Sequence, residues 1–247
     1  MSLPIQIRAT FRESWPDGIR QLAIPAVSLQ LSQEDVLYLG QRQPLFREAF
    51  GISTSRIDCP ELPKRIEGVL SQIRCPVFPR IGYCSWKRGV PCIPPCHNAR
   101  EILSIILSAD ERVARGLIAG VSCGDPVWLH LVEWRDMSRA TEIRVFIHDG
   151  LMIGATAYNE DPQTPIDLGT GLALRARLRE FLHLLLPTLH LRSLVVDLRL
   201  DRGTGDSRTE LIEINPFSIM TGSGHFEWIS YKSFNQTLRF AGVQLDL

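Results

Sequence analysis

The sequence predicts an α+β protein built from antiparallel strand pairs with helices packed on one side. The dipeptide Asp149-Gly150 separates two alternating segments, 142–148 and 151–157, and favours the tight two-residue turn of a β-hairpin. Segments 193–200 and 209–214 flank a turn-rich connection and predict a second hairpin. Antiparallel pairs combined with separate helical segments are typical of the α+β class.

Two helices are predicted from the residues that cap their first turns. Ser32 precedes two acidic residues and is expected to cap a helix there. Asn98 with Glu101 three residues later resembles a capping box, and the apolar residues that follow are spaced as on one face of a helix. Further helices are expected at 64–73 and 172–186, and further strands at 77–81 and 127–133.

The composition is that of a globular protein without a global electrostatic field. The chain has 247 residues, of which 45% are hydrophobic, and its 27 basic and 27 acidic residues cancel. Nucleic acid and anionic membranes are therefore not indicated as partners, and an anionic ligand must be held by local charge. The start lacks a secretory pattern, and the richest apolar stretch, 182–189, is short and broken by Pro187, so we expect a cytoplasmic protein.

Six cysteines in such a chain indicate reduced thiols rather than a disulfide framework. Cys92, Cys96 and His97 bring three possible zinc ligands close together. A fourth ligand at a familiar spacing is missing, so we favour unligated cysteines in a loop and expect no zinc.

Two carboxylates interrupt apolar strands in the C-terminal part of the chain. Asp197 lies within segment 194–198 and Glu213 within 211–214, while Asn215 shares the face of Glu213 because side chains alternate along a strand. Buried carboxylates must be paired, protonated or metal-bound, and three hard oxygen donors on neighbouring strands suit Mg²⁺. Outward-facing carboxylates on an edge hairpin are the alternative, and spacing alone does not decide between the two.

Three motifs follow one another along the chain: Phe78-Pro79-Arg80-Ile81, Glu142-Ile143-Arg144-Val145-Phe146 and Leu211-Ile212-Glu213-Ile214-Asn215-Pro216-Phe217. Together they resemble the cell division cycle protein 123 (D123) family, and the resemblance runs in order over about 77–228. The first seventy residues resemble the family only loosely. The resemblance implies an ATP-grasp fold and a role as an assembly factor for a translation initiation complex.

The resemblance also implies residues that bind ATP and Mg²⁺. Arg80 falls where the family has a lysine that reaches the phosphates, and Lys87 falls near a second basic position. Glu133 and Trp134 fall on the segment that links the two lobes and contacts adenine, although Trp134 is equally well explained as a core residue. Arg144 is expected either to stabilise charge on a transferring phosphoryl group or to pair with Glu142.

Asp197, Glu213 and Asn215 fall on the family's metal-binding positions, with Glu213 in place of an aspartate. The wider ATP-grasp superfamily often uses Glu-x-Asn there. Arg80 replaces lysine, which changes a point charge into a planar fork. Arg88-Gly89 and Glu133 also depart from the family's pattern, which puts its partner-binding role in more doubt than nucleotide binding.

The sequence therefore predicts an α+β protein of the ATP-grasp fold with two lobes of antiparallel sheet plus helices. We expect an N-terminal helical region at 1–73, a small lobe at 74–132 and a large lobe with the metal site at 133–247. Two functions compete. An ATP-dependent carboxylate-amine ligase that works through an acyl phosphate is slightly preferred, and a non-catalytic nucleotide-binding assembly factor with a protein partner is the alternative.

Overall fold

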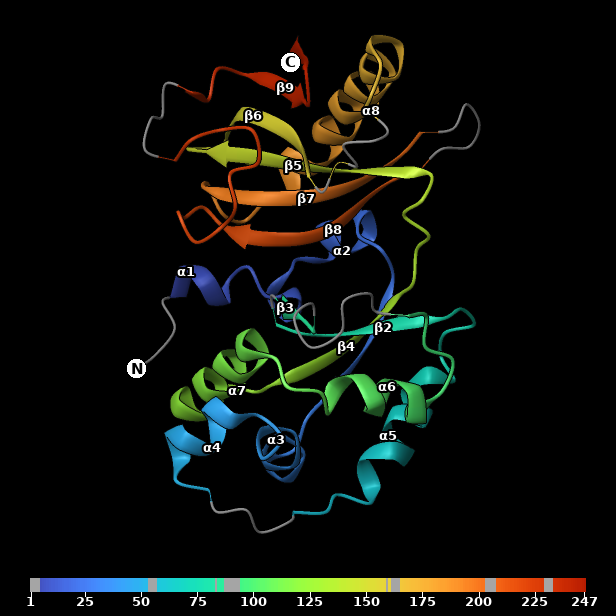
Figure 1. The fold of residues 1–247 in the computed structure, drawn as a ribbon, viewed down its shortest axis with the longest axis vertical. Coiled ribbons are helices and arrows are strands. Elements are labelled where there is room, and N and C mark those ends of the chain that lie inside the picture. Colours follow the sequence, from blue (N-terminus) through green and yellow to red (C-terminus); the bar gives the residue numbers. More distant parts are fainter. Residues whose placement is uncertain are drawn as a thin grey trace. The chain divides into compact units, whose positions relative to one another are not determined.

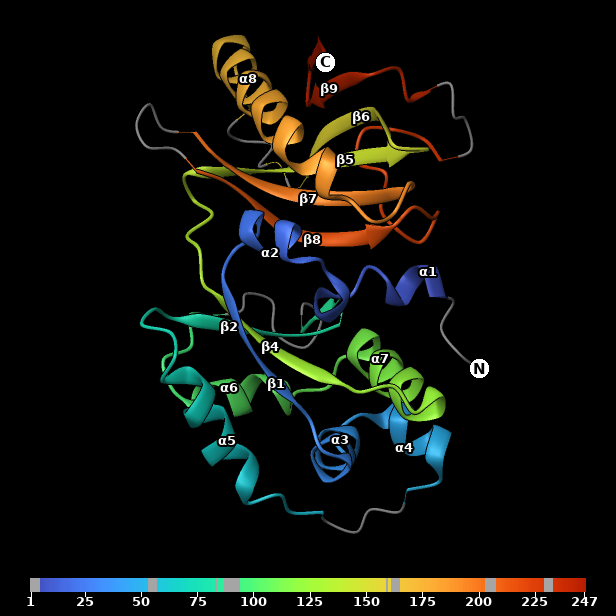
Figure 2. The ribbon, with the colours of Figure 1, turned by 180° about the vertical axis from the view of Figure 1, so that it is seen from behind.

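The computed structural model describes residues 5–52, 57–82, 84–86, 94–158, 160, 165–202, 208–228 and 233–247. These residues form two compact units, each with its own sheet and core (Figures 1 and 2). The first unit comprises Met1–Glu13 and Pro25–Trp134, and the second comprises Ser14–Ile24 and Arg135–Leu247. Within the described residues, every helix is too short or too polar to cross a bilayer.

The first unit has an antiparallel sheet covered by helices on one face. Its strands run in the order β1 (Ala26–Gln30), β4 (Trp128–Glu133), β2 (Val77–Ile81) and β3 (Cys84–Ser85). The helices are α1 (Ile5–Arg8), α3 (Gln33–Gly40), α4 (Pro44–Phe50), α5 (Glu61–Leu70), α6 (Ala99–Ile106) and α7 (Glu111–Cys123). Apolar residues from the sheet, such as Leu129 and Leu131, pack with residues of α3 to α7 into one core.

The opposite face of this sheet carries a row of polar side chains. The strand register aligns Ser28, His130, Arg80 and Ser85 across β1, β4, β2 and β3. These residues alternate with the core residues because side chains of a strand point to opposite faces in turn. β1 therefore joins the N-terminal part of the chain to the same sheet as Arg80.

The second unit has a larger sheet with the strand order β10-β9-β6-β5-β7-β8. The strands are β10 (Val243–Asp246), β9 (Thr237–Phe240), β6 (Leu151–Tyr158), β5 (Ala140–His148), β7 (Leu194–Asp201) and β8 (Thr209–Pro216). Neighbours are antiparallel except for the parallel pair β6 and β9. Helix α8 (Leu168–Leu185), extended by the short η2 (Leu186–Thr188), crosses one face, and α2 (Asp17–Leu22) adds Ile19 to the same core (Figure 2).

The segment 217–228 folds back onto the other face of this sheet. Its Phe226 and Trp228 pack edge-on against Phe146 of β5, with ring centroids 5.6 and 5.7 Å away. Gly224 has φ +59° and lies against Thr156 of β6, so close that a Cβ there would come within 2.3 Å of the threonine Cγ2. The segment is thus fitted closely onto the sheet.

Both predicted hairpins are confirmed. Asp149 and Gly150 both have positive φ, as the primed two-residue turn requires, and His148 pairs with Leu151 across it. β7 and β8 pair antiparallel, and residues 203–207 of their connection lie outside the described part of the chain. The predicted caps are also present, since Ser32 forms a capping box with Asp35 and Asn98 accepts from the Glu101 N–H.

Two predicted helix boundaries were wrong. α5 begins at Glu61, because Pro63 falls in its first turn, where a missing N–H costs nothing, and it ends at Leu70. α8 begins at Leu168, where the Asp167 side chain caps the Thr170 N–H, so Gly169 and Gly171 lie inside the helix. The aspartate cap stabilises this first turn although it contains two glycines.

Candidate functional site

The structure brings Asp197, Glu213 and Asn215 together on the face of the second unit's sheet that lies away from α8. We call this face the open face. Asp197 of β7 lies opposite Glu213 of β8, and Asn215 follows two residues along β8. The Asn215 amide donates to Asp197 Oδ2 at 3.0 Å and to Glu213 Oε1 at 3.2 Å. All three side chains are buried. The alternative of outward-facing carboxylates on an edge hairpin is therefore wrong.

Arg144 is the direct partner of Asp197. Its Nε and Nη2 donate to the two carboxylate oxygens at 2.7 and 2.8 Å, and its Nη1 donates to the Gly222 carbonyl at 2.8 Å. The guanidinium also lies 3.8 Å from the ring centroid of Tyr158. Every nitrogen of this guanidinium is thus used within the second unit. The register of β5 and β7 sets Arg144 opposite Asp197. Pairing with Glu142 and stabilisation of phosphoryl charge, the two alternatives from sequence, stay predictions.

Burial dominates the electrostatics of this group. It raises the pKa of Asp197 to about 7, and the Glu213 carboxylate acts in the same direction, while Arg144 opposes the shift. For Arg144, burial favours the neutral form, but the hydrogen bonds to Asp197 and the charges of Asp197, Tyr158 and Glu213 together raise its pKa above the usual range. Arg144 therefore stays charged and favours the ionised form of Asp197 against burial. A divalent cation beside the two carboxyl groups would favour their ionised forms further.

The donor set fits Mg²⁺ in its chemistry, with two carboxylates and one amide. Within the described residues, no group of three or more His, Cys, Asp or Glu side chains is arranged to hold a metal. Asp197 Oδ2 already accepts from both Arg144 and Asn215. An ion bound by Asp197 and Glu213 would thus require Asn215 to turn its amide oxygen toward the metal.

A β-bulge explains why the open face is more acidic than the sequence pattern predicts. Asp197 pairs with Glu213 and the next residue, Leu198, pairs with Leu211, so Ile212 is an extra residue on β8. Strict alternation would place Glu210 on the face opposite Glu213. The bulge restores Glu210 to the open face, opposite Arg199.

In the first unit, Arg80 lies buried on the polar face of β2, next to His130. His130 Nε2 lies 2.9 Å from Glu13 Oε2, and its Nδ1 lies 2.8 Å from Ser28 Oγ. Burial lowers the pKa of His130, Arg12 and Arg80 act in the same direction, and Glu13 opposes them. The ring is therefore neutral, and since a carboxylate only accepts, Nε2–H donates to Glu13 while Nδ1 accepts from the Ser28 hydroxyl.

The remaining predicted site residues are distant in sequence from Asp197, Glu213 and Asn215. Glu133 ends β4, where its N–H donates to the Pro25 carbonyl at 2.9 Å, and the Trp134 N–H donates to the Pro76 carbonyl at 2.7 Å. Both residues belong to the first unit with Arg80, whereas Arg144 and the three metal-ligand candidates belong to the second. Lys87 lies outside the described residues. The roles of these residues stay predictions.

Sequence reasoning missed Tyr158 and Gly222, which complete the surroundings of Arg144. Gly222 acts through its backbone carbonyl, and a Cβ there would lie 3.1 Å from Arg144 Nη1. A backbone acceptor leaves no signal in side-chain chemistry. Tyr158 stands opposite Glu142 in the hairpin, so its place on this face followed from the register, but its stacking on Arg144 did not.

Comparisons with known proteins agree with this architecture. The family model D123 matches residues 94–240, which is more than half of the chain. The structure of Cdc123 from Schizosaccharomyces pombe is similar with a TM-score of 0.67 at 20% identity, covering 95% of this chain and 94% of that one. Its C-terminally truncated form gives a TM-score of 0.69 at the same identity and coverage.

A curated relative is similar in sequence as well. A translation initiation factor eIF2 assembly protein from Vanderwaltozyma polyspora is 26% identical over 207 residues, which are 76% of this chain and 54% of that protein. The chain thus spans about half the length of the relative. Two α+β units of this topology define a protein of the ATP-grasp fold, as predicted. The chain belongs to the D123 family.

Proposed function

We propose that the chain is a nucleotide-binding assembly factor for a protein complex, with Asp197, Glu213 and Asn215 as the Mg²⁺ ligands. The state of Arg144 is the observation that carries the choice of function. A ligase needs a cation that stabilises the negative charge developing on a transferring phosphoryl group. Arg144 instead makes a bidentate pair with Asp197 and a third bond to the Gly222 carbonyl. Its role is therefore to position Asp197.

The relatives support the same choice. The relative from V. polyspora is named for the assembly of eIF2, and the family match covers the strands that carry the carboxylates. The ligase preferred from sequence rested on Arg144 as a phosphoryl-stabilising cation. The assembly factor, our alternative from sequence, fits these observations better. We infer a protein partner, with a translation initiation factor as the first candidate.

ATP and Mg²⁺ have separate tasks in this proposal. Bound Mg²⁺ would neutralise phosphate charge. Asp197 and Glu213 would hold the ion, Arg144 would keep Asp197 ionised and oriented, and Arg80 would contact phosphate oxygens as a planar fork. The family resemblance implies that Glu133 and Trp134 contact adenine and that Lys87 provides a second phosphate contact.

Thermal unfolding with ATP tests nucleotide binding. ATP at a hundred times its dissociation constant is expected to stabilise the fold by about 2.7 kcal/mol when Mg²⁺ is present. Glu213→Gln is expected to remove the dependence on Mg²⁺, whereas the exposed Glu227→Gln is a matched control that retains it. If the parent chain gains no stability at millimolar nucleotide, the nucleotide proposal is wrong.

A second measurement separates the assembly factor from the ligase. We expect ATP turnover to stay at its basal rate when a panel of carboxylates and amines is added, and a stable protein partner to co-purify with the chain. Carboxylate-dependent release of ADP would instead establish the ligase.

A further inference from the structure

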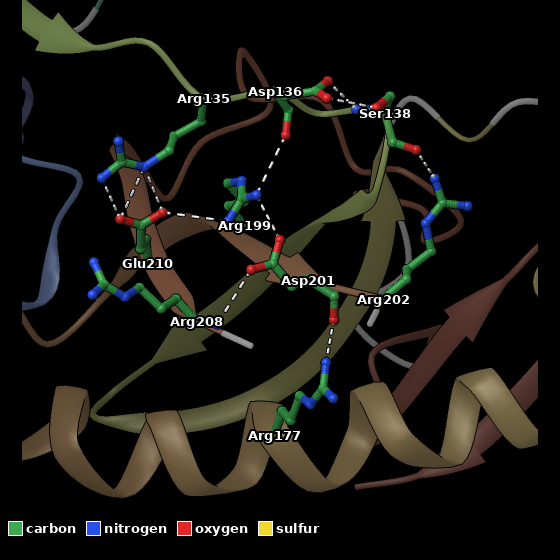
Figure 3. A network of polar contacts seen from close by, with 9 residues as sticks. All are labelled: Arg135, Asp136, Ser138, Arg177, Arg199, Asp201, Arg202, Arg208 and Glu210. Carbon is green, nitrogen blue, oxygen red and sulfur yellow. Dashed lines mark hydrogen bonds and ion pairs between the residues drawn. The ribbon is translucent and has the colours of Figure 1, made fainter. Parts of the chain in front are cut away.

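Arginines gather at one end of the second unit's sheet, where β5 begins, β7 ends and β8 begins (Figure 3). We call this group the arginine cluster. Figure 3 shows its arginines Arg135, Arg177, Arg199, Arg202 and Arg208 and its acidic members Asp136, Asp201 and Glu210. Arg139 is the sixth arginine, because its carbonyl accepts from the Arg202 N–H. Asp206 adds a negative charge in the sequence but lies outside the described residues. Positive charge is therefore in excess here although the whole chain is neutral.

The buried layer of the cluster is held by carboxylates. Arg135 forms a fork on Glu210, with its Nε 3.1 and 3.0 Å from the two oxygens and its Nη2 2.9 Å from Oε1. Arg199 pairs with Asp201 and lies 3.4 Å from Glu210 Oε2. Arg199 and Glu210 are both buried. These ion pairs hold the backbone around them in place and compensate the negative charges of Asp201 and Glu210.

The outer layer is held mainly by neutral acceptors. Arg202 Nη2 donates to the Ser138 carbonyl at 2.6 Å, and Arg177 donates to the Asp201 carbonyl. A carbonyl orients a guanidinium without cancelling its charge. Arg202 and Arg208 are exposed and flank the connection between β7 and β8, and Arg139 is exposed nearby, where its carbonyl accepts from the Arg202 N–H at 2.8 Å.

We propose that the arginine cluster binds an acidic segment of a protein partner. Guanidinium groups bind carboxylates through two parallel hydrogen bonds, as Arg135 already does with Glu210. Because the chain carries no net charge, attraction of an anionic segment is confined to such a local excess. The proposal deepens the proposed function, on which it rests for the existence of a partner.

Binding of a fluorescein-labelled octaglutamate peptide to the full chain tests the proposal. The double variant Arg202→Gln, Arg208→Gln removes two outer charges and leaves the buried pairs intact. The matched control is Arg100→Gln, Arg115→Gln, which removes two exposed charges from helices of the first unit. We expect anisotropy to show about tenfold weaker binding for the cluster variant, since two exposed ion pairs are lost and each is individually weak. The control should stay within about twofold.

Three outcomes would overturn the proposal: no peptide binding by the parent chain, equal loss in the control, or tighter binding of an oligouridine RNA that the cluster variant also loses. Failure of this proposal and failure of nucleotide binding are distinguishable. The cluster variant should keep its stabilisation by ATP and Mg²⁺, and Glu213→Gln should keep its affinity for octaglutamate. An unchanged melting temperature of the cluster variant without ligand shows that the loss is not unfolding.

Discussion

At the scale of single residues, Arg144 and Asp197 form the most deeply buried ion pair described in the second unit. The carboxylate is completely buried and receives both hydrogen bonds of the guanidinium fork. Removing one member of such a pair leaves the other charge without compensation, which costs more than the pair itself contributes.

Arg144→Ala is therefore expected to lower the free energy of unfolding by about 3–5 kcal/mol, as measured by urea denaturation. It should also weaken Mg²⁺-dependent ATP binding, since Asp197 loses the group that orients it. Arg179→Ala, an exposed arginine on α8, is the control and should change stability little. Full stability of Arg144→Ala would contradict the positioning role.

His130 provides a test of pH dependence in the first unit. Burial holds its folded-state pKa below the usual 6.5, so between these two values the unfolded chain binds more protons. Stability should fall as the pH drops below about 6.5 and level off below the folded-state pKa. The charged groups facing the ring are Glu13, Arg12 and Arg80.

His130→Gln should flatten this loss of stability with acid, measured by urea denaturation at about pH 7.5 and pH 5.5. His183→Gln, on the exposed side of α8, should leave the slope unchanged. An equal slope in His130→Gln and the parent chain would mean that other groups cause the acid sensitivity.

The gathering of Asp197, Glu213 and Asn215 was accessible to sequence reasoning because each interrupts an apolar strand and the strands are joined by one hairpin. The partner of Arg144 was not. Arg144 and Asp197 meet through the pairing of β5 with β7, which are separated in sequence by β6 and α8. Single-sequence periodicity contains no information about such distant registers.

At the scale of elements, regular strands and capped helices were predicted well, and irregular backbone was not. The bulge at Ile212 changes which residues share a face with Glu213, and nothing in its side chain indicates an extra residue in the ladder. The fold-back of 217–228 depends on glycines whose neighbours come from β5 and β6.

Gly224→Ala tests how closely that segment is fitted. Both the positive φ and the contact with Thr156 oppose a side chain at Gly224, whereas Gly242 has φ +79° with open space around it. Gly224→Ala is expected to destabilise the chain by roughly 1–3 kcal/mol more than Gly242→Ala in urea denaturation, because only the first variant adds overpacking. Equal losses of stability in the two variants would show that segment 217–228 can shift to accommodate the added methyl group without an energetic penalty.

At the scale of the whole molecule, the α+β class and the ATP-grasp fold followed from sequence, through the hairpins and the three motifs. The path of the chain between the units did not. Ser14–Ile24 belongs to the second unit although residues on both sides of it belong to the first. A short helix with few apolar residues has no sequence pattern that indicates the core it will join.

This path has a consequence for the order in which the chain folds. The Ile24 N–H donates to the Leu211 carbonyl at 3.0 Å, and Trp15 and Ile19 are part of the core beneath the second sheet. Most of the chain separates Ile24 from Leu211, so the entropy of closing that loop must be overcome before their contacts stabilise the fold. The first unit can complete its sheet without β8, whereas the contacts between Ile24 and Leu211 in the second unit cannot form until β8 is in place. Refolding should therefore end with a slow step in which α2 docks, the last contact to form and the first to open.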